Sequence, residues 1–145
     1  MTAKDYLKQI EKLDTLIKNK LIEKQQWRDA ALGITARMGD EKVQSSGNPQ
    51  KMAAAIERYI DLEKEIDVII DKLIDTKREI ISVIEQLDSR EYDLLHKIYV
   101  QQKELVEVAD ELKCGYSTVT TAHGRALINV QRIIDRKNVT NLYVM

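Results

Sequence analysis

The sequence is poor in residues that interrupt helices or build cross-linked folds. Among 145 residues there are one Pro, five Gly and one Cys, and aromatic residues make up 5% with no Phe. A single Cys excludes an internal disulfide framework and a cysteine-rich zinc site, and two His are too few for a histidine-based metal or catalytic site. The sequence has few helix-breaking residues and 32% charged residues, which indicates long helices rather than a β-sandwich. The sequence therefore predicts an all-α protein with no metal, cofactor or catalytic residues.

Long apolar runs and an excess of one charge are absent too. No apolar run is long enough to span a membrane, and residues 1–6 lack the apolar stretch of a secretory signal. We therefore expect a cytoplasmic protein without a membrane partner. The 23 basic and 24 acidic residues give a net charge of −1, which excludes only a uniformly basic nucleic-acid binder.

Two long amphipathic segments make up the first part of the chain. Apolar residues from Tyr6 to Leu21 recur at steps of three and four, which predicts a helix over residues 3–37. From Met52 to Leu87 the alternation of three and four is strict, which predicts a coiled-coil-like helix over residues 50–87. Gly, Ser, Asn and Pro are concentrated in residues 38–49, which indicates a loop. Residues 1–87 thus predict a long antiparallel helical hairpin.

The charges and the widths of the apolar stripes leave two interpretations of this hairpin, one within a single chain and one in a homo-oligomer. Residues 1–37 hold eight basic and five acidic residues, and residues 51–87 hold six basic and nine acidic, so the two helices differ in sign. Their apolar stripes can bury each other within one chain. The second stripe is broadened by Ile70, Ile74, Ile81 and Ile84, which favours a homo-oligomer formed through the hairpin.

After Leu87 the pattern changes to short helices. Asp88, followed three residues later by Glu91, fits a capping box that begins a new helix. Residues 105–112 predict another short helix, Lys113, Cys114 and Gly115 a tight turn, and residues 116–136 a further helix, with a tail over 137–145. We expect residues 88–136 to form a helix-turn-helix domain, in which small Ala109 lets Val119 approach closely.

The helix over 116–136 would lie in the major groove of DNA. Residues 112–145 hold five basic residues against one acidic residue, so this end of the chain is locally basic. The position four residues after Ala109 is usually Gly because its backbone is left-handed, and here it is Lys113. The candidate DNA-binding residues are Lys113, Tyr116, Ser117, Thr120, Thr121, Gly124, Arg125 and Arg132. The Ser and Thr side chains are candidates for base edges, and Lys113, Arg125 and Arg132 for phosphates.

The C-terminal motifs resemble region 4 of sigma-70-type factors. The matching stretches are Leu87-Asp-Ser-Arg-Glu-Tyr-Asp-Leu-Leu-His-Lys-Ile-Tyr-Val, Val108-Ala-Asp-Glu-Leu, Ser117-Thr-Val and Arg125-Ala-Leu. With Ala3-Lys-Asp-Tyr-Leu-Lys-Gln-Ile, Asp75-Thr-Lys-Arg-Glu-Ile-Ile and His123-Gly-Arg-Ala-Leu, residues 1–136 resemble a family of small phage and prophage proteins of Gram-positive bacteria, similar to the RinA and ArpU regulators. The resemblance implies control of late or packaging gene transcription.

Three functions follow as hypotheses, none of them enzymatic. The first is a phage-derived transcriptional regulator that binds double-stranded DNA. The second is a small-terminase-like DNA-packaging protein, although such proteins usually place the DNA-binding unit first. The third is a coiled-coil adaptor that contacts RNA polymerase through residues 88–111, which hold seven acidic and three basic residues.

Overall fold

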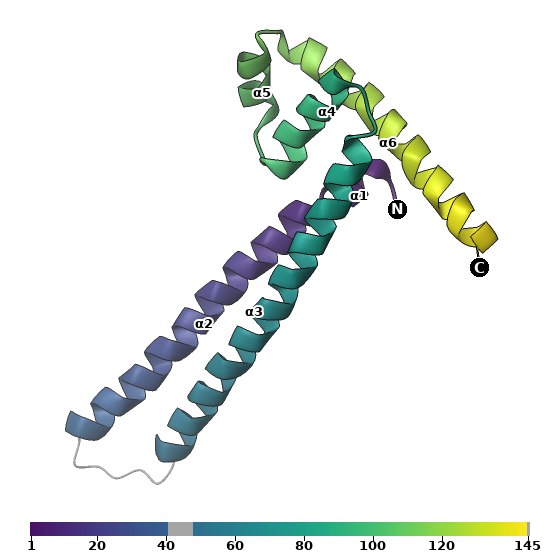
Figure 1. Ribbon diagram of the computed structural model, residues 1–145. Coiled ribbons are helices and arrows are strands. Elements are labelled where there is room, and N and C mark those ends of the chain that lie inside the picture. Colours follow the sequence, from purple (N-terminus) through teal and green to yellow (C-terminus); the bar gives the residue numbers. More distant parts are fainter. Residues whose placement is uncertain (41–47, 145) are drawn as a thin grey trace. The chain divides into compact units, whose positions relative to one another are not determined.

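The computed structural model describes residues 1–40 and 48–144, and only the backbone of residues 34–40, 48 and 140–144. All regular structure in this part of the chain is helical (Figure 1). The helices are α1 (Ala3–Leu7), α2 (Gln9–Asp40), α3 (Asn48–Ile84), α4 (Ser89–Leu95), the π-helical segment η1 (His96–Val100), α5 (Leu105–Leu112) and α6 (Tyr116–Val144). The expected all-α class is thus confirmed. Most of the expected loop over 38–49 lies outside the described residues.

The chain divides into two compact units. Unit 1 comprises Met1–Lys12 and Leu73–Met145, and unit 2 comprises Leu13–Lys72. The expected boundary at residue 87 therefore falls inside unit 1. The physical reason is that apolar residues of the first turns of the chain are buried in one cluster with the C-terminal turns of α3.

Unit 1 is organised around two apolar clusters that meet at α4. The larger joins α1, α2, α3, η1 and α6, and its members include Leu7, Ile84 and Val130, all fully buried. The smaller joins α4, α5 and α6. Adjacent residues of α4 belong to different clusters, because Leu94 is buried in the smaller and Leu95 in the larger. This short helix therefore fixes the α5 and α6 packing to the rest of unit 1.

In unit 2 the helices α2 and α3 lie side by side and antiparallel (Figure 1). The Nζ atom of Lys20 lies 2.9 Å from the Oε2 atom of Glu65, and that of Lys24 lies 3.2 Å from the Oε1 atom of Glu63. The partner numbers fall along α3 as they rise along α2, as antiparallel helices require. The buried contact is narrow and includes Ile17, Ala55, Leu62 and Ile66.

Several helix ends differ from the expectation. Helix α6 continues to Val144, so the expected tail over 137–145 is helical as far as the structure describes it. Asp88 is the N-cap of α4 as expected, and its Oδ1 atom accepts a hydrogen bond of 2.8 Å from the backbone N–H of Glu91. The reciprocal half of the capping box is absent, because the Glu91 carboxylate accepts hydrogen bonds from Asn129 of α6 instead.

Candidate nucleic-acid interface

A left-handed turn connects α5 to α6. Lys113 adopts φ 55° and ψ 44°, the left-handed conformation that the sequence pattern places at this position. The backbone N–H of Cys114 donates to the carbonyl of Ala109 at 3.1 Å, and that of Lys113 donates to the carbonyl of Asp110 at 3.2 Å. These two bonds form a Schellman motif, which satisfies carbonyls at the end of α5. Gly115 has no positive φ, so the turn does not use the conformational freedom of its one glycine.

Close packing fixes the angle between α5 and α6. Ala109 and Val119 are buried in one cluster with Val108 of α5 and Leu94 of α4. Because Ala109 carries only a methyl group, the side chain of Val119 can pack against α5 at this point, and Val119 is only 1% exposed. Leu112 and Cys114, the apolar residues on either side of Lys113, are both exposed.

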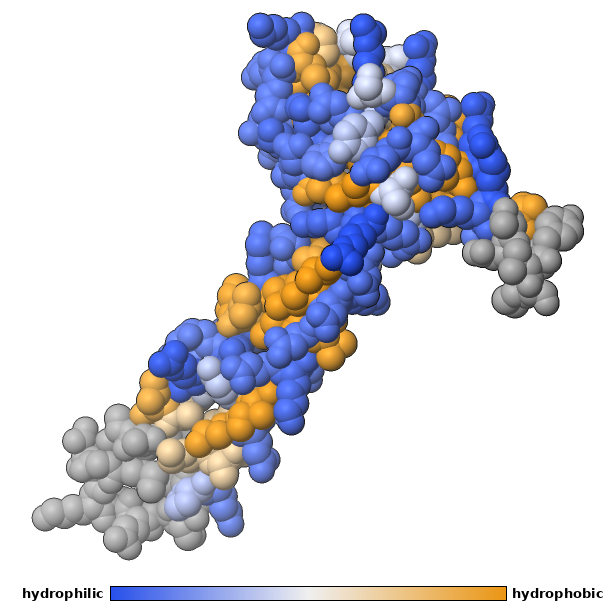
Figure 2. All heavy atoms as spheres, in the orientation of Figure 1, coloured by the Kyte–Doolittle hydropathy of each residue, from blue (hydrophilic) through white to orange (hydrophobic). Residues whose placement is uncertain are grey.

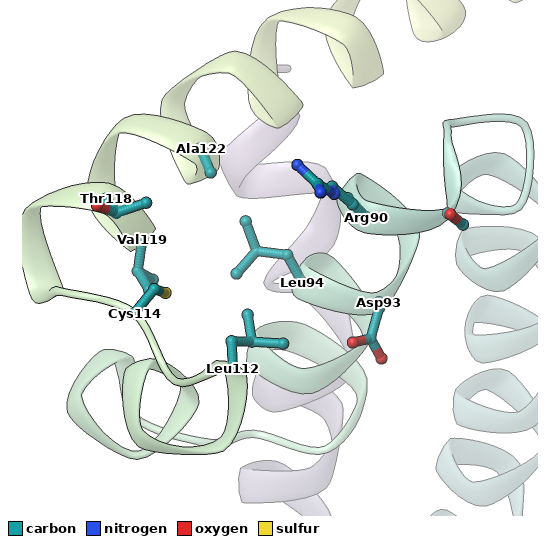
Figure 3. Close-up of a pocket in the computed structure, with 9 residues that line it drawn as sticks. Arg90, Asp93, Leu94, Leu112, Cys114, Thr118, Val119 and Ala122 are labelled. Carbon is teal, nitrogen blue, oxygen red and sulfur yellow. The ribbon is translucent and has the colours of Figure 1, made fainter.

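Leu112 and Cys114 instead line a shallow groove between α4, α5 and α6 (Figure 3). Its volume is about 490 Å³, and Leu94, Val119 and Ala122 form its apolar floor. Arg90 and Asp93 of α4 supply the charged groups at its edge. The groove adjoins the start of α6 on the side that faces α4, where the exposed Thr118 also lines it.

The structure exposes nearly all of the predicted DNA-binding residues. Seven of them are exposed and Thr120 is half-buried. Ser117, Thr121 and Gly124 follow each other at steps of four and three residues, so they share one outward face of α6. A Cβ atom at Gly124 would meet nothing within 4 Å, so this face is open there. The first turns of α6 therefore present a polar surface with little relief.

The threonine hydroxyls are engaged within the helix. The Oγ1 atoms of Thr120 and Thr121 both donate to the backbone carbonyl of Ser117 at 2.9 Å. Their protons are thereby used, while the lone pairs and methyl groups stay available. In this state the two threonines can accept hydrogen bonds from an adenine or cytosine amino group and can contact a thymine methyl group.

The basic residues among the predicted DNA-binding residues fall into two places. Lys113 and Arg125 are exposed near the turn. Arg132 lies fifteen residues beyond Ser117, about 22 Å along the helix, and its Nη1 atom donates to the Oδ1 atom of Asn129 at 3.2 Å. Asn129 in turn donates to both carboxylate oxygens of Glu91 at 2.9 Å. Arg132 is therefore held beside α4, apart from the other predicted residues.

His123 of α6 packs inward rather than lying on the exposed face of the helix. It is half-buried, and its Nε2 atom lies 2.6 Å from the Oη atom of Tyr99 in η1. Burial, and secondarily the positive charge of Lys4, lower the pKa of His123 below its usual value of 6.5. Burial, with the nearby carboxylate of Glu11, raises the pKa of Tyr99 to about 12. Both shifts favour the neutral forms, and the hydrogen bond between the phenol and the imidazole attaches the early part of α6 to η1.

The sequence did not reveal the groups that hold α6 in place. They include Glu91, Asn129 and the Tyr99–His123 pair, together with Gln131, whose Oε1 atom accepts a hydrogen bond of 2.7 Å from the backbone N–H of Ala3. Each pair joins residues far apart in the chain, so no local spacing marks it. A polar residue at an inward position of a predicted helix is the only available signal, and it does not name the partner.

Among the residues whose side chains are described, no group of His, Cys, Asp or Glu is placed to hold a metal ion. No described helix is both long and apolar enough to cross a membrane.

The described residues define an all-helical chain in which a left-handed turn joins two packed helices and leaves the start of the second exposed. No protein-family model matches the chain, and neither a curated protein nor a solved structure matches it. The resemblance to sigma region 4 and to small phage regulators therefore stays a prediction.

Proposed function

We propose that the chain is a phage-type transcriptional regulator that binds double-stranded DNA through the start of α6. The observation that carries the proposal is the turn at Lys113, where a Schellman motif and the Ala109–Val119 contact hold α6 against α5. In a helix-turn-helix unit this arrangement presents the second helix to the major groove. The α4 to α6 segment would be that unit, and α2 and α3 a helical hairpin.

The charge distribution supports a DNA-facing surface on α6. Its first turn contains no acidic residue, and residues 112–145 hold five basic residues against Asp135 alone. Lys113 and Arg125 flank the exposed Ser117, Thr121 and Gly124, so phosphate contacts can lie on either side of a base-reading face. Arg132 is a candidate for a contact with more distant phosphates.

The proposal is tested by selection from a library of duplexes with a randomised core, followed by anisotropy titrations at several salt concentrations. The expected result is an enriched motif bound more tightly than unselected duplex, with an affinity that falls steeply with salt. Binding with no preference for any duplex, or no binding at low salt, would sink the proposal.

Two substitutions separate the roles of the site residues. Arg125→Ala should weaken binding to all duplexes and lower the slope of the salt dependence by about one. Thr121→Ala should change the preference among duplexes, because it removes an acceptor and a methyl group. Lys64→Ala, which removes an exposed basic residue from unit 2, is the matched control and should change neither.

Self-association through α2 and α3 and control of late or packaging genes are part of the same proposal. Two linked copies would present two copies of α6, as the symmetric half-sites of many operators require. A packaging or lysis cassette directly downstream of the gene would support the late role. A ring of many subunits would favour the packaging protein instead.

The exposed acidic residues of α5 favour one further candidate function, contact with RNA polymerase. Glu104, Glu107 and Asp110 are exposed on or beside α5, and the exposed Val106 lies among them. An acidic surface with an apolar centre suits a basic partner surface. Retention of purified polymerase by the wild-type chain, and loss of retention in Glu107→Lys, would support this role.

A further inference from the structure

Unit 2 buries too little of its apolar surface to form a core of its own. Among its residues whose side chains are described, four hydrophobic residues are buried, whereas nine large hydrophobic residues are exposed. A pair of helices can bury only one stripe of each helix against the other. The remaining apolar surface of unit 2 is therefore left in contact with water in the single chain (Figure 2).

One side of the α2–α3 pair is closed by ion pairs. Arg58 lies 3.0 Å from Glu23 and 3.2 Å from Glu65, and Glu65 also pairs with Lys20 at 2.9 Å. These four side chains link the two helices along one edge of their contact. We call this side the ion-paired face.

The opposite side is crossed by one ion pair, Lys24 with Glu63, and carries an apolar stripe on both helices. On α3, Ile56 and Ile60 are one turn apart, and Ile70 lies fourteen residues, or about four turns, beyond Ile56. On α2, Leu21 and Leu32 are eleven residues, or about three turns, apart. We call this side, defined by Leu21, Leu32, Ile56, Ile60 and Ile70, the open face.

A groove of about 490 Å³ shows that the two stripes meet on one side of the pair. Leu32 and Arg28 of α2 line it together with Met52, Ile56 and Tyr59 of α3. Tyr59 is also contacted by the Nζ atom of Lys24, 4.9 Å from its ring centre. The groove is thus apolar with basic groups at the α2 edge.

We propose that the open face is covered by the open face of a second copy of this chain, so that two copies of unit 2 form a four-helix bundle. This deepens the self-association included in the proposed function, and rests on it, by naming the face and the number of copies. Four-helix bundles pack amphipathic helices around a shared core in the way that these stripes require.

The size of the open face fits a dimer. The part of α3 inside unit 2, residues 48–72, is about 37 Å long, and two helices side by side are about 20 Å wide. The resulting area of about 740 Å² on each copy is close to the roughly 800 Å² per partner of a stable interface.

Charge complementarity favours a second copy over a different partner. Lys18 pairs with Asp14 and Glu63 with Lys24 inside the chain, which leaves Arg28 as the basic edge of the stripe on α2 and Asp67, between Ile60 and Ile70, as the acidic edge of the stripe on α3. A two-fold axis that places α2 of one copy against α3 of the other brings the basic edge against the acidic edge twice. A partner with a single sign of charge would repel one of the two edges.

The test compares pairs of substitutions on the same helix. In each pair one residue lies on the open face and the other, also apolar and exposed, lies off it. Leu21 is 47% exposed on the open face, and Leu16 of the same helix is 42% exposed on the side of the ion-paired face. On α3 the corresponding pair is Ile56 and Val68, which are 40% and 69% exposed. The mass of each full-length chain is measured by light scattering and sedimentation velocity over a range of concentrations, and helicity by circular dichroism.

The wild type, L16E and V68E should have twice the mass of one chain, whereas L21E and I56E should dissociate at least tenfold more readily. The dissociated variants should keep most of their helix signal, because the ion-paired face and unit 1 are untouched. A wild type that stays monomeric at every concentration would overturn the proposal. Equal dissociation of L16E and L21E, or a larger ring, would do the same.

Failure of this inference can be told apart from failure of DNA binding. A monomeric L21E chain that still prefers the selected motif over random duplex leaves the DNA-binding proposal standing. Conversely, a dimeric wild type without any duplex preference overturns DNA binding while it supports the open-face dimer.

Discussion

The two units of this chain are built from similar amphipathic helices, but they bury the apolar stripes of those helices to different extents. Among the side chains that the structure describes, unit 1 buries sixteen hydrophobic residues and leaves seven large ones exposed, whereas unit 2 buries four and exposes nine. Unit 1 gains its core by bringing together segments from both ends of the chain, so each apolar stripe has several neighbours. Unit 2 has two helices only. The difference teaches that amphipathic periodicity predicts helices equally well in both, but the number of neighbours decides whether a stripe is buried.

The largest effect should come from deleting buried leucine side chains in the two units. Leu95 of unit 1 and Leu62 of unit 2 are both fully buried. Leu95→Ala should lower the free energy of unfolding by about 2–5 kcal/mol, because helices on several sides hold the cavity open. Leu62→Ala should cost less, since two helices alone can close together. Urea denaturation followed by circular dichroism measures both, and a larger loss for Leu62→Ala would contradict the comparison.

Backbone strain also distinguishes the units. The non-glycine residues with positive φ in the described chain are Gln102 and Lys113, both in unit 1. Lys113→Gly should raise the free energy of unfolding by up to about 1 kcal/mol, because the left-handed conformation costs a non-glycine residue about 1–2 kcal/mol and glycine loses part of that gain in chain entropy. Lys113→Ala is the control: it removes the charge but keeps the strained conformation, so any gain in its stability argues against this explanation.

Substitutions at two helical glycines, one in each unit, should distinguish an effect on stability from an effect on duplex binding. A Cβ atom at Gly33 or at Gly124 would meet nothing within 4 Å. Both Gly→Ala changes should therefore stabilise the chain by about 0.8–1 kcal/mol through helix propensity. Only Gly124→Ala should weaken duplex binding, because it adds a methyl group to the side of α6 that we propose faces DNA. Equal binding by the two variants would show that the backbone at Gly124 does not approach DNA.

The smallest effect should be a pH dependence confined to unit 1. Because burial lowers the pKa of His123 in the folded chain, the unfolded chain binds its proton more readily. The stability that this neutral histidine contributes is complete above its ordinary pKa of about 6.5. It decreases as the pH falls through that value towards the lower folded pKa.

Urea denaturation between about pH 7.5 and pH 5 measures this loss. His123→Gln, which cannot take up a proton, should reduce the slope, whereas His96→Gln should leave it unchanged. An undiminished slope in His123→Gln would assign the pH dependence to other groups.

The sequence predicted what depends on local spacing and failed where distant residues meet. The helices, the Asp88 cap and the left-handed position at Lys113 follow from patterns within a few residues. Three features depend on packing between distant segments. They are the π-helical segment η1, the hydrogen bonds between Glu91 and Asn129, and the inward orientation of the His123 side chain. The end of α6 was also misplaced, because charged residues after Ile134 are compatible with either a helix or a tail.

The sequence predicted which residues of the candidate site are exposed better than it predicted how those residues are arranged. Exposure of Ser117, Thr121 and Arg125 follows from the helical period once Val119 is buried. The separation of Arg132 from the others could not be foreseen, since it is fixed by Asn129 and, through it, by Glu91. Contact with DNA remains a prediction for all of them.

The position of α4 between two clusters has a consequence for dissecting or transplanting this chain. Leu94 and Leu95 are neighbours on one short helix, yet the surroundings of Leu95 come from α1, α3 and α6. A fragment that begins at residue 88 would carry α6 but would lack the N-terminal half of the core that holds it. The segment 88–136 is therefore not a portable module. Chimaeras should exchange unit 2 instead, with residues 1–12 retained beside the C-terminal helices.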